Sequence, residues 1–164
     1  MSKSDQNSTL SKEQIEEVYG LYKNGQFKEA ISQIKALNKI YPNVPLLFNL
    51  IGACYTSLGK LEGAVQMFKT AVSLKPDYAE AHKNLGNTLK ELGRLDESIE
   101  SFVNVTVIDP DLVDAHYNLA NTLKELNRLD ESVESYKRVI AINPDFAQAH
   151  NNLGNAQKEL NQFD

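Results

Sequence analysis

Hydrophobic and polar residues alternate along the chain with the period of an α-helix. In residues 79–112, Leu85 and Leu89 recur with the spacing of one apolar helix face. Gly93 follows, and glycine readily adopts the left-handed conformation with which many helices end. A second stretch with helical spacing continues until Pro110, because the residue before a proline disfavours the α conformation. The pattern predicts two helices joined by a short turn.

This predicted hairpin is repeated along the chain at a constant interval. The interval is set by the prolines Pro42, Pro76, Pro110 and Pro144, which are evenly spaced. Residues 79–112 and 113–146 are identical at 21 of 34 positions, which excludes coincidence. The predicted organisation is a disordered segment at 1–10, a degenerate unit at 11–44, units at 45–78, 79–112 and 113–146, and the first helix of an incomplete unit at 147–164.

Small residues recur at two positions of the unit. They are Gly52, Gly86, Ala120 and Gly154 in the first helix, and Ala30, Ala64, Ser98 and Ser132 in the second. A glycine inside a helix costs roughly 1 kcal/mol relative to alanine. Its recurrence requires a compensating gain, so we expect the two helices of each unit to cross closely at these positions.

The combined pattern resembles the tetratricopeptide repeat, in both the length of its unit and its signature residues. The signature positions in the unit at 45–78 are Phe48, Ile51, Gly52, Tyr55, Ala64, Phe68 and Pro76. The unit at 11–44 matches less well in its first helix, which Ser11 and Gln14 begin as a capping box. The resemblance implies an all-α fold, an α-solenoid in which antiparallel helix pairs form a right-handed superhelix with a concave groove.

Composition and charge narrow the range of partners. The formal net charge is −5, so a surface suited to nucleic acid or to anionic lipid is not expected. No apolar stretch is long enough to span a membrane, and residues 1–10 lack the apolar core of a signal peptide. These observations predict a cytoplasmic location. Cys54 is the single cysteine and lies in an apolar helical pattern, which predicts a buried, unreactive thiol.

The residues that could bind a metal ion or act in catalysis are explained by structural roles. His82, His116 and His150 occupy one repeat position, and adjacent packed helices lie about 8–10 Å apart, too far for a shared metal ion. An imidazole there is expected to fill the place of an aromatic residue. No phosphate-binding loop, zinc-protease motif or nucleophile elbow is present. We therefore predict no enzymatic activity, no metal and no cofactor.

The opposite side of the first helices carries asparagines in register. The two series are Asn84, Asn118 and Asn152, and Asn87, Asn121 and Asn155, flanked by Lys83, Tyr117, Lys90 and Lys124. Asparagine is a weaker helix former than lysine or glutamate, but its amide both donates and accepts hydrogen bonds. Such a series is predicted to bind the backbone of an extended peptide. It resembles the asparagine ladder in the repeats of O-GlcNAc transferases.

Two alternatives to this binding mode are open. The asparagines could be an unused solvated face inherited by duplication, and the unit at 45–78 has Leu50 and Ala53 in their place. A carboxylate clamp, as in receptors of chaperone tails, is matched by Lys83, Asn87 and Asn118. Gln148 and Asn152 stand where that clamp needs cations, so this mode is disfavoured.

The function expected from the sequence is a non-catalytic scaffold that binds an extended protein segment in its groove. The alternative is the substrate-recognition arm of a larger enzyme of glycosyltransferase, sulfotransferase or oxygenase type. Core-type residues persist in the last helix, which suggests the N-terminal part of a longer protein. They also suggest self-association through the open C-terminal end.

Overall fold

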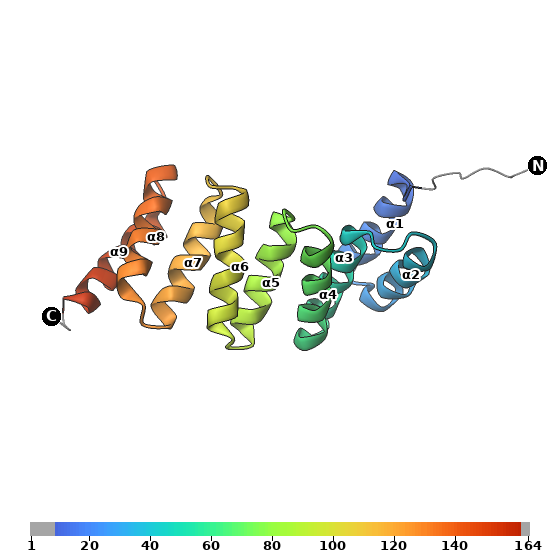
Figure 1. Cartoon of the computed structure of the whole chain (residues 1–164), viewed down its shortest axis with the longest axis horizontal. Helices are drawn as coiled ribbons and strands as arrows, with labels where there is room; N and C mark the ends of the chain where they lie inside the picture. Colours follow the sequence, from blue (N-terminus) through green and yellow to red (C-terminus); the bar gives the residue numbers. More distant parts are fainter. Residues whose placement is uncertain (1–8, 162–164) are drawn as a thin grey trace, which may run out of the picture. The chain divides into compact units, whose positions relative to one another are not determined.

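The computed structural model describes residues 9–161, and within this range the chain forms nine α-helices and no strand (Figure 1). The predicted all-α class is confirmed. The chain divides into two compact units, residues 1–76 and 77–164. The first unit holds α1 (Lys12–Lys23), α2 (Phe27–Ile40), α3 (Pro45–Ser57) and α4 (Leu61–Leu74); the second holds α5 (Ala79–Glu91), α6 (Leu95–Ile108), α7 (Val113–Glu125), α8 (Leu129–Ile142) and α9 (Ala147–Leu160).

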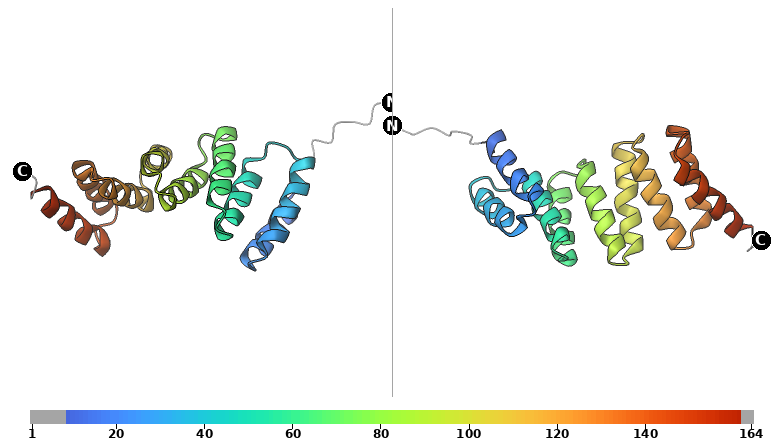
Figure 2. Two further views of the ribbon diagram at one scale, coloured as in Figure 1. Left: turned by 90° about the horizontal axis from the view of Figure 1, so that it is seen from below. Right: turned by 180° about the vertical axis from the view of Figure 1, so that it is seen from behind.

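Within each unit, every helix packs against the next one along the chain. In residues 77–164 the result is a row of antiparallel helices (Figure 2). The turns inside the hairpins depend on a residue with positive φ, which is 73° at Gly93 and 58° at Asn127. Arg94 N then donates to Leu89 O at 2.9 Å and closes the turn. Asparagine can replace glycine here because it tolerates the left-handed region better than most residues.

The start of α1 is fixed by its predicted capping box. Ser11 N donates to Gln14 Oε1 at 3.0 Å, and Gln14 N donates to Ser11 Oγ at 3.3 Å. Leu10 packs against the buried cluster that contains Val18 and Leu47. Residues 1–8 of the segment predicted to be disordered lie outside the described residues, as do residues 162–164 of the last predicted unit.

The close crossing predicted from the small residues is present in both units. A methyl group on Gly52 would lie 2.5 Å from the ring of Phe68, and one on Gly86 would lie 2.9 Å from the ring of Phe102. Ser98 Oγ donates to Gly86 O at 2.8 Å, directly across the crossing. The glycines are thus required because an aromatic ring from the second helix occupies the space of their side chains.

The same contact is modified in the hairpin of α7 and α8. Ala120 replaces the glycine and is fully buried beside Tyr136. Ser132 Oγ donates to Ala120 O at 2.8 Å, as Ser98 does to Gly86. At Gly154 in α9, an added methyl group would have no other atom within 4 Å, because no described helix packs on that side of α9.

Cys54 is fully buried in α3, as predicted. Burial raises the pKa of its thiol from 9.0 to about 11. The unfolded chain therefore loses the thiol proton near pH 9 while the folded chain retains it. We expect the free energy of unfolding to fall as pH rises from 9 toward 11, and the fall to be smaller in Cys54→Ala. Urea denaturation of both proteins across this pH range measures the difference, and parallel pH profiles would contradict it.

Candidate functional site

The six asparagines singled out in the sequence all lie in the unit 77–164, on helices α5, α7 and α9. We call their shared side the asparagine face, defined by Asn84, Asn87, Asn118, Asn121, Asn152 and Asn155. Asn87 and Asn155 are exposed, and the other four are half-buried. Leu50, at the equivalent position of α3, is buried in the core, so the amide series belongs to the second unit alone.

Ion pairs between repeats show that α5, α7 and α9 lie side by side in one register. Lys90 Nζ on α5 is 3.3 Å from Glu125 Oε2 on α7. The equivalent pair one repeat later joins Lys124 Nζ to Glu159 Oε1 at 2.9 Å. Both lysines were predicted to flank a bound peptide, and the structure shows them paired with carboxylates of the next repeat. Because these pairs are partly exposed, they contribute little to stability.

A hydrogen-bonded cluster joins α7, α8 and α9 on the asparagine face. Asn152 Nδ2 on α9 donates to Tyr117 Oη and to Asn121 Oδ1 on α7, each at 3.2 Å. Tyr136 Oη on α8 donates to the same Asn121 Oδ1 at 2.5 Å. We call these four residues the amide–tyrosine cluster. Two of the six asparagines, from neighbouring repeats, therefore contact each other in this cluster.

The hydrogen bonds of the cluster determine which of its polar groups remain open. Asn152 uses its amide nitrogen as a donor to two oxygens, and Asn121 uses its amide oxygen to accept from two groups. A primary amide has two donor hydrogens and one carbonyl acceptor. Among the four residues of the cluster, the groups that these bonds leave open are therefore the Nδ2 hydrogens of Asn121, the Oδ1 of Asn152 and the hydroxyl hydrogen of Tyr117. The two amides together offer one donor group and one acceptor.

The two tyrosines of the cluster are held by aromatic packing. The ring of Tyr117 lies 6.1 Å from that of Tyr136 and 5.0 Å from that of Phe146, measured between centroids. Tyr136 is fully buried, and burial raises the pKa of its hydroxyl. The hydroxyl therefore stays protonated near neutral pH and remains a donor to Asn121.

We call the contact between the first helices of two successive repeats a step. The preceding step, between α5 and α7, has other residues at the equivalent positions. Phe102 occupies the place of Tyr136, and Lys83, half-buried, occupies the place of Tyr117. A phenylalanine has no hydroxyl to direct toward Asn87, which is exposed. Asn118 is half-buried, and its backbone carbonyl accepts from Thr122 Oγ1 at 2.8 Å, a bond within α7. Asn87 thus lacks the tyrosine hydroxyl that Asn121 has as a partner.

The histidines have a structural role that their spacing did not reveal. His116 Nε2 donates to Pro110 O at 2.9 Å, and His150 Nε2 donates to Pro144 O at 2.8 Å. These two imidazoles therefore hold the turns that precede their own helices. Of the three histidines only His82 is buried, as expected for an imidazole that fills an aromatic site, whereas His116 is half-buried and His150 is exposed. In residues 9–161, no group of three or more His, Cys, Asp or Glu side chains is arranged to hold a metal ion.

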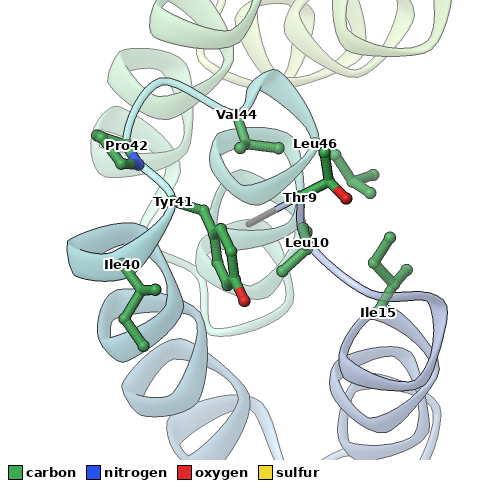
Figure 3. Close-up of a pocket in the computed structure, with 8 residues that line it drawn as sticks. All are labelled: Thr9, Leu10, Ile15, Ile40, Tyr41, Pro42, Val44 and Leu46. Atoms are coloured by element: carbon green, nitrogen blue, oxygen red, sulfur yellow. The ribbon is translucent and has the colours of Figure 1, made fainter. Parts of the chain in front are cut away.

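An apolar pocket of about 490 Å³ lies in the unit 1–76 (Figure 3). Leu10 and Ile15 line it from the start of α1, and Ile40 and Tyr41 from the end of α2; Thr9, Pro42, Val44 and Leu46 complete the lining. Ile40 is 61% exposed. The lining offers apolar contact with few polar groups, and so lacks the convergent donors and acceptors of a specific small-molecule site.

Comparison with known proteins gives a family match. The family model described as TPR repeat matches residues 52–93, 86–127 and 120–161. A curated relative, anaphase-promoting complex subunit 3 of Dictyostelium discoideum, is 36% identical over 56 residues, which make up 34% of this chain and 6% of that protein. The chain therefore spans only a small part of that relative.

Solved structures share the fold. The crystal structure of MamA has a TM-score of 0.82 at 23% identity, covering 94% of this chain and 87% of that one. YrrB, described as a TPR protein with an unusual peptide-binding site, has a TM-score of 0.72 at 26% identity, covering 82% of this chain and 69% of that one. The first TPR of Spaghetti (RPAP3), bound to an HSP90 peptide, has a TM-score of 0.66 at 18% identity, covering 71% of this chain and 92% of that one. The predicted α-solenoid class is confirmed.

In the part of the chain that the structure describes, none of the helices is long and apolar enough to cross a membrane.

Proposed function

Since the chain belongs to the tetratricopeptide repeat family and is a repeat scaffold, we propose that its asparagine face binds an extended segment of another protein. The bound segment would hydrogen-bond through its backbone to the side-chain amides of α5, α7 and α9. Backbone N–H and C=O groups are present in every sequence, so such binding tolerates many side chains. An extended segment loses conformational entropy on binding, so a single site should have modest affinity.

The observation that carries this proposal is the open pair of groups at the amide–tyrosine cluster. Asn121 on α7 retains amide hydrogens and Asn152 on α9 retains an amide oxygen, and the two side chains are hydrogen-bonded to each other. A peptide backbone offers the complementary acceptor and donor. The peptide-binding site named for YrrB, which is 26% identical to this chain, lends support from a protein of the same fold.

The charges of the face favour an internal segment over a free C-terminus. A carboxylate clamp needs cations where this chain has Gln148 and Asn152, and the nearby Lys90 and Lys124 are paired with glutamates. Asn152, at a position where the clamp needs a cation, is committed to the amide–tyrosine cluster. The recognition we propose therefore rests on neutral amides.

The second expected function, the recognition arm of a larger enzyme, gains no support from the family match or from the similar structures. Self-association through α9 likewise stays a prediction. A groove of about 530 Å³ is present between α8 and α9, lined by Val133, Leu160 and several polar residues, but it does not identify a partner.

The proposal is tested with peptides selected on the wild-type protein from a random-sequence library. We expect Asn87→Ala combined with Asn118→Ala to weaken binding about 10- to 100-fold, since each lost hydrogen bond contributes about 0.5–1.5 kcal/mol. This pair is preferable to one that includes Asn121, whose removal would also disturb Tyr136 and Asn152. Isothermal titration calorimetry measures the affinities.

Asn104→Ala provides the matched control. Asn104 is an exposed asparagine of α6, outside the asparagine face, so its removal should leave affinity unchanged. Circular dichroism melts should show that all variants remain folded. Equal affinity of the double variant and the wild type would refute the proposed binding mode.

A further inference from the structure

We infer that Tyr136 is a positioning residue for peptide binding: its hydroxyl orients the Asn121 amide so that the α7–α9 step recognises the peptide backbone in one direction. This inference rests on the proposed function. The peptide and Tyr136 need not touch for this effect, because the hydroxyl acts through Asn121.

An asparagine side-chain amide can be oriented in two ways. Turning the side-chain amide over exchanges its oxygen and nitrogen, so an unconstrained asparagine can present either a donor or an acceptor. Asn121 is constrained, because its Oδ1 accepts from Tyr136 Oη and from Asn152 Nδ2. In the reverse orientation the Nδ2 hydrogens of Asn121 would face those of Asn152, and the Tyr136 hydroxyl would lose the acceptor of its proton. Asn121 therefore presents its Nδ2 hydrogens to the ligand.

The hydrogen bonds of the amide–tyrosine cluster also strengthen its open groups. Hydrogen bonds in a chain polarise one another, and each bond strengthens the next. The chain here runs from Tyr136 to Asn121 and from Asn152 to the same oxygen. An amide whose oxygen accepts two bonds is a better donor at its nitrogen, and Asn152, which donates twice, is a better acceptor at its oxygen. The step thus offers a strong donor to a peptide C=O and a strong acceptor to a peptide N–H.

The α5–α7 step lacks the hydroxyl group that orients the amide in the α7–α9 step. Phe102 stands in place of Tyr136 beside the same backbone crossing, and both side chains are fully buried. The two residues differ by one hydroxyl group. Asn87 therefore lacks the bond that orients Asn121, and the two steps of the face should differ in how strictly they specify backbone direction.

The test exchanges this hydroxyl between the two steps. Tyr136→Phe keeps the ring and matches Phe68 and Phe102 in the other units, so folding should be preserved. With a library-selected peptide, we expect affinity to fall about 3- to 10-fold, as for one hydrogen bond. The matched variant Phe102→Tyr adds a hydroxyl beside Asn87 and should not weaken binding.

Ester substitutions in the peptide backbone separate a change in the orientation of Asn121 from a general loss of protein stability. Each N–H of the selected peptide is replaced in turn by an ester oxygen. Wild type should lose affinity sharply at the one position whose N–H meets Asn152. In Tyr136→Phe a second position should also become sensitive to the ester, because Asn121 can then turn its Oδ1 toward a peptide N–H. Unchanged affinity in Tyr136→Phe, or an identical ester profile, would overturn the inference.

The outcomes distinguish the two proposals. If Asn87→Ala with Asn118→Ala weakens binding while Tyr136→Phe does not, the proposed function stands and the role of Tyr136 is wrong. If peptides bind without any effect of the asparagine variants, or no peptide can be selected, the proposed function fails and the role of Tyr136 fails with it.

Discussion

Replacement of Phe102 by alanine is expected to lower the free energy of unfolding of the unit 77–164 by about 3–5 kcal/mol. Its ring is fully buried and packs with Ile99, Leu119 and Leu123, and it also covers Gly86. The truncation would leave a cavity at the point where α5, α6 and α7 meet, and the surrounding helices can close it only in part. Urea denaturation monitored by circular dichroism measures the loss.

Val103→Ala is the control for this truncation. Val103 is the next residue of α6 and is 41% exposed, so its replacement should change the free energy of unfolding by about 0.5 kcal/mol or less. Similar losses for the two variants would show that Phe102 does not form the centre of the packing described here.

Gly52→Ala and Gly154→Ala are expected to change stability in opposite directions, although they are the same substitution at one repeat position. At Gly52, the new methyl group would lie 2.5 Å from the buried Phe68 ring, and overpacking of this kind costs about 1–3 kcal/mol. At Gly154 there is open space, so alanine should gain up to about 1 kcal/mol of helix propensity.

Thermal and urea unfolding of the two variants measures these changes. Gly86→Ala should also lower stability, but by less than Gly52→Ala, because its added methyl group would lie 2.9 Å from the ring of Phe102 rather than 2.5 Å from a ring. Stabilisation by alanine at Gly52 would contradict the tight crossing, since it would mean that the aromatic ring moves aside at little cost.

The repeat architecture could be predicted from the sequence because it depends on local rules that recur in each unit. Gly93 and Asn127 both lie in the left-handed region, as expected for residues that end a helix. The close crossing at Gly86 followed from the cost of glycine inside a helix, which only a tertiary contact offsets. In each case the physical cause lies within a single repeat.

The detail of the asparagine face could not be predicted in this way. The cluster depends on Asn152 reaching Asn121, 31 residues earlier, and on a hydroxyl from Tyr136 that the repeat pattern treats as equivalent to Phe102. Lys90 could have faced a ligand, but it is paired with Glu125. Such choices depend on distances between neighbouring repeats, which residue spacing within one repeat does not determine.

The most direct test of the account follows the side-chain amides of the asparagines by NMR while a library-selected peptide is added. The account predicts that the amide signals of Asn87, Asn118 and Asn121 shift with saturation and that the signal of Asn104 on α6 does not. Shifts confined to Asn104 and its neighbours on α6, with the asparagine face unchanged, would contradict it.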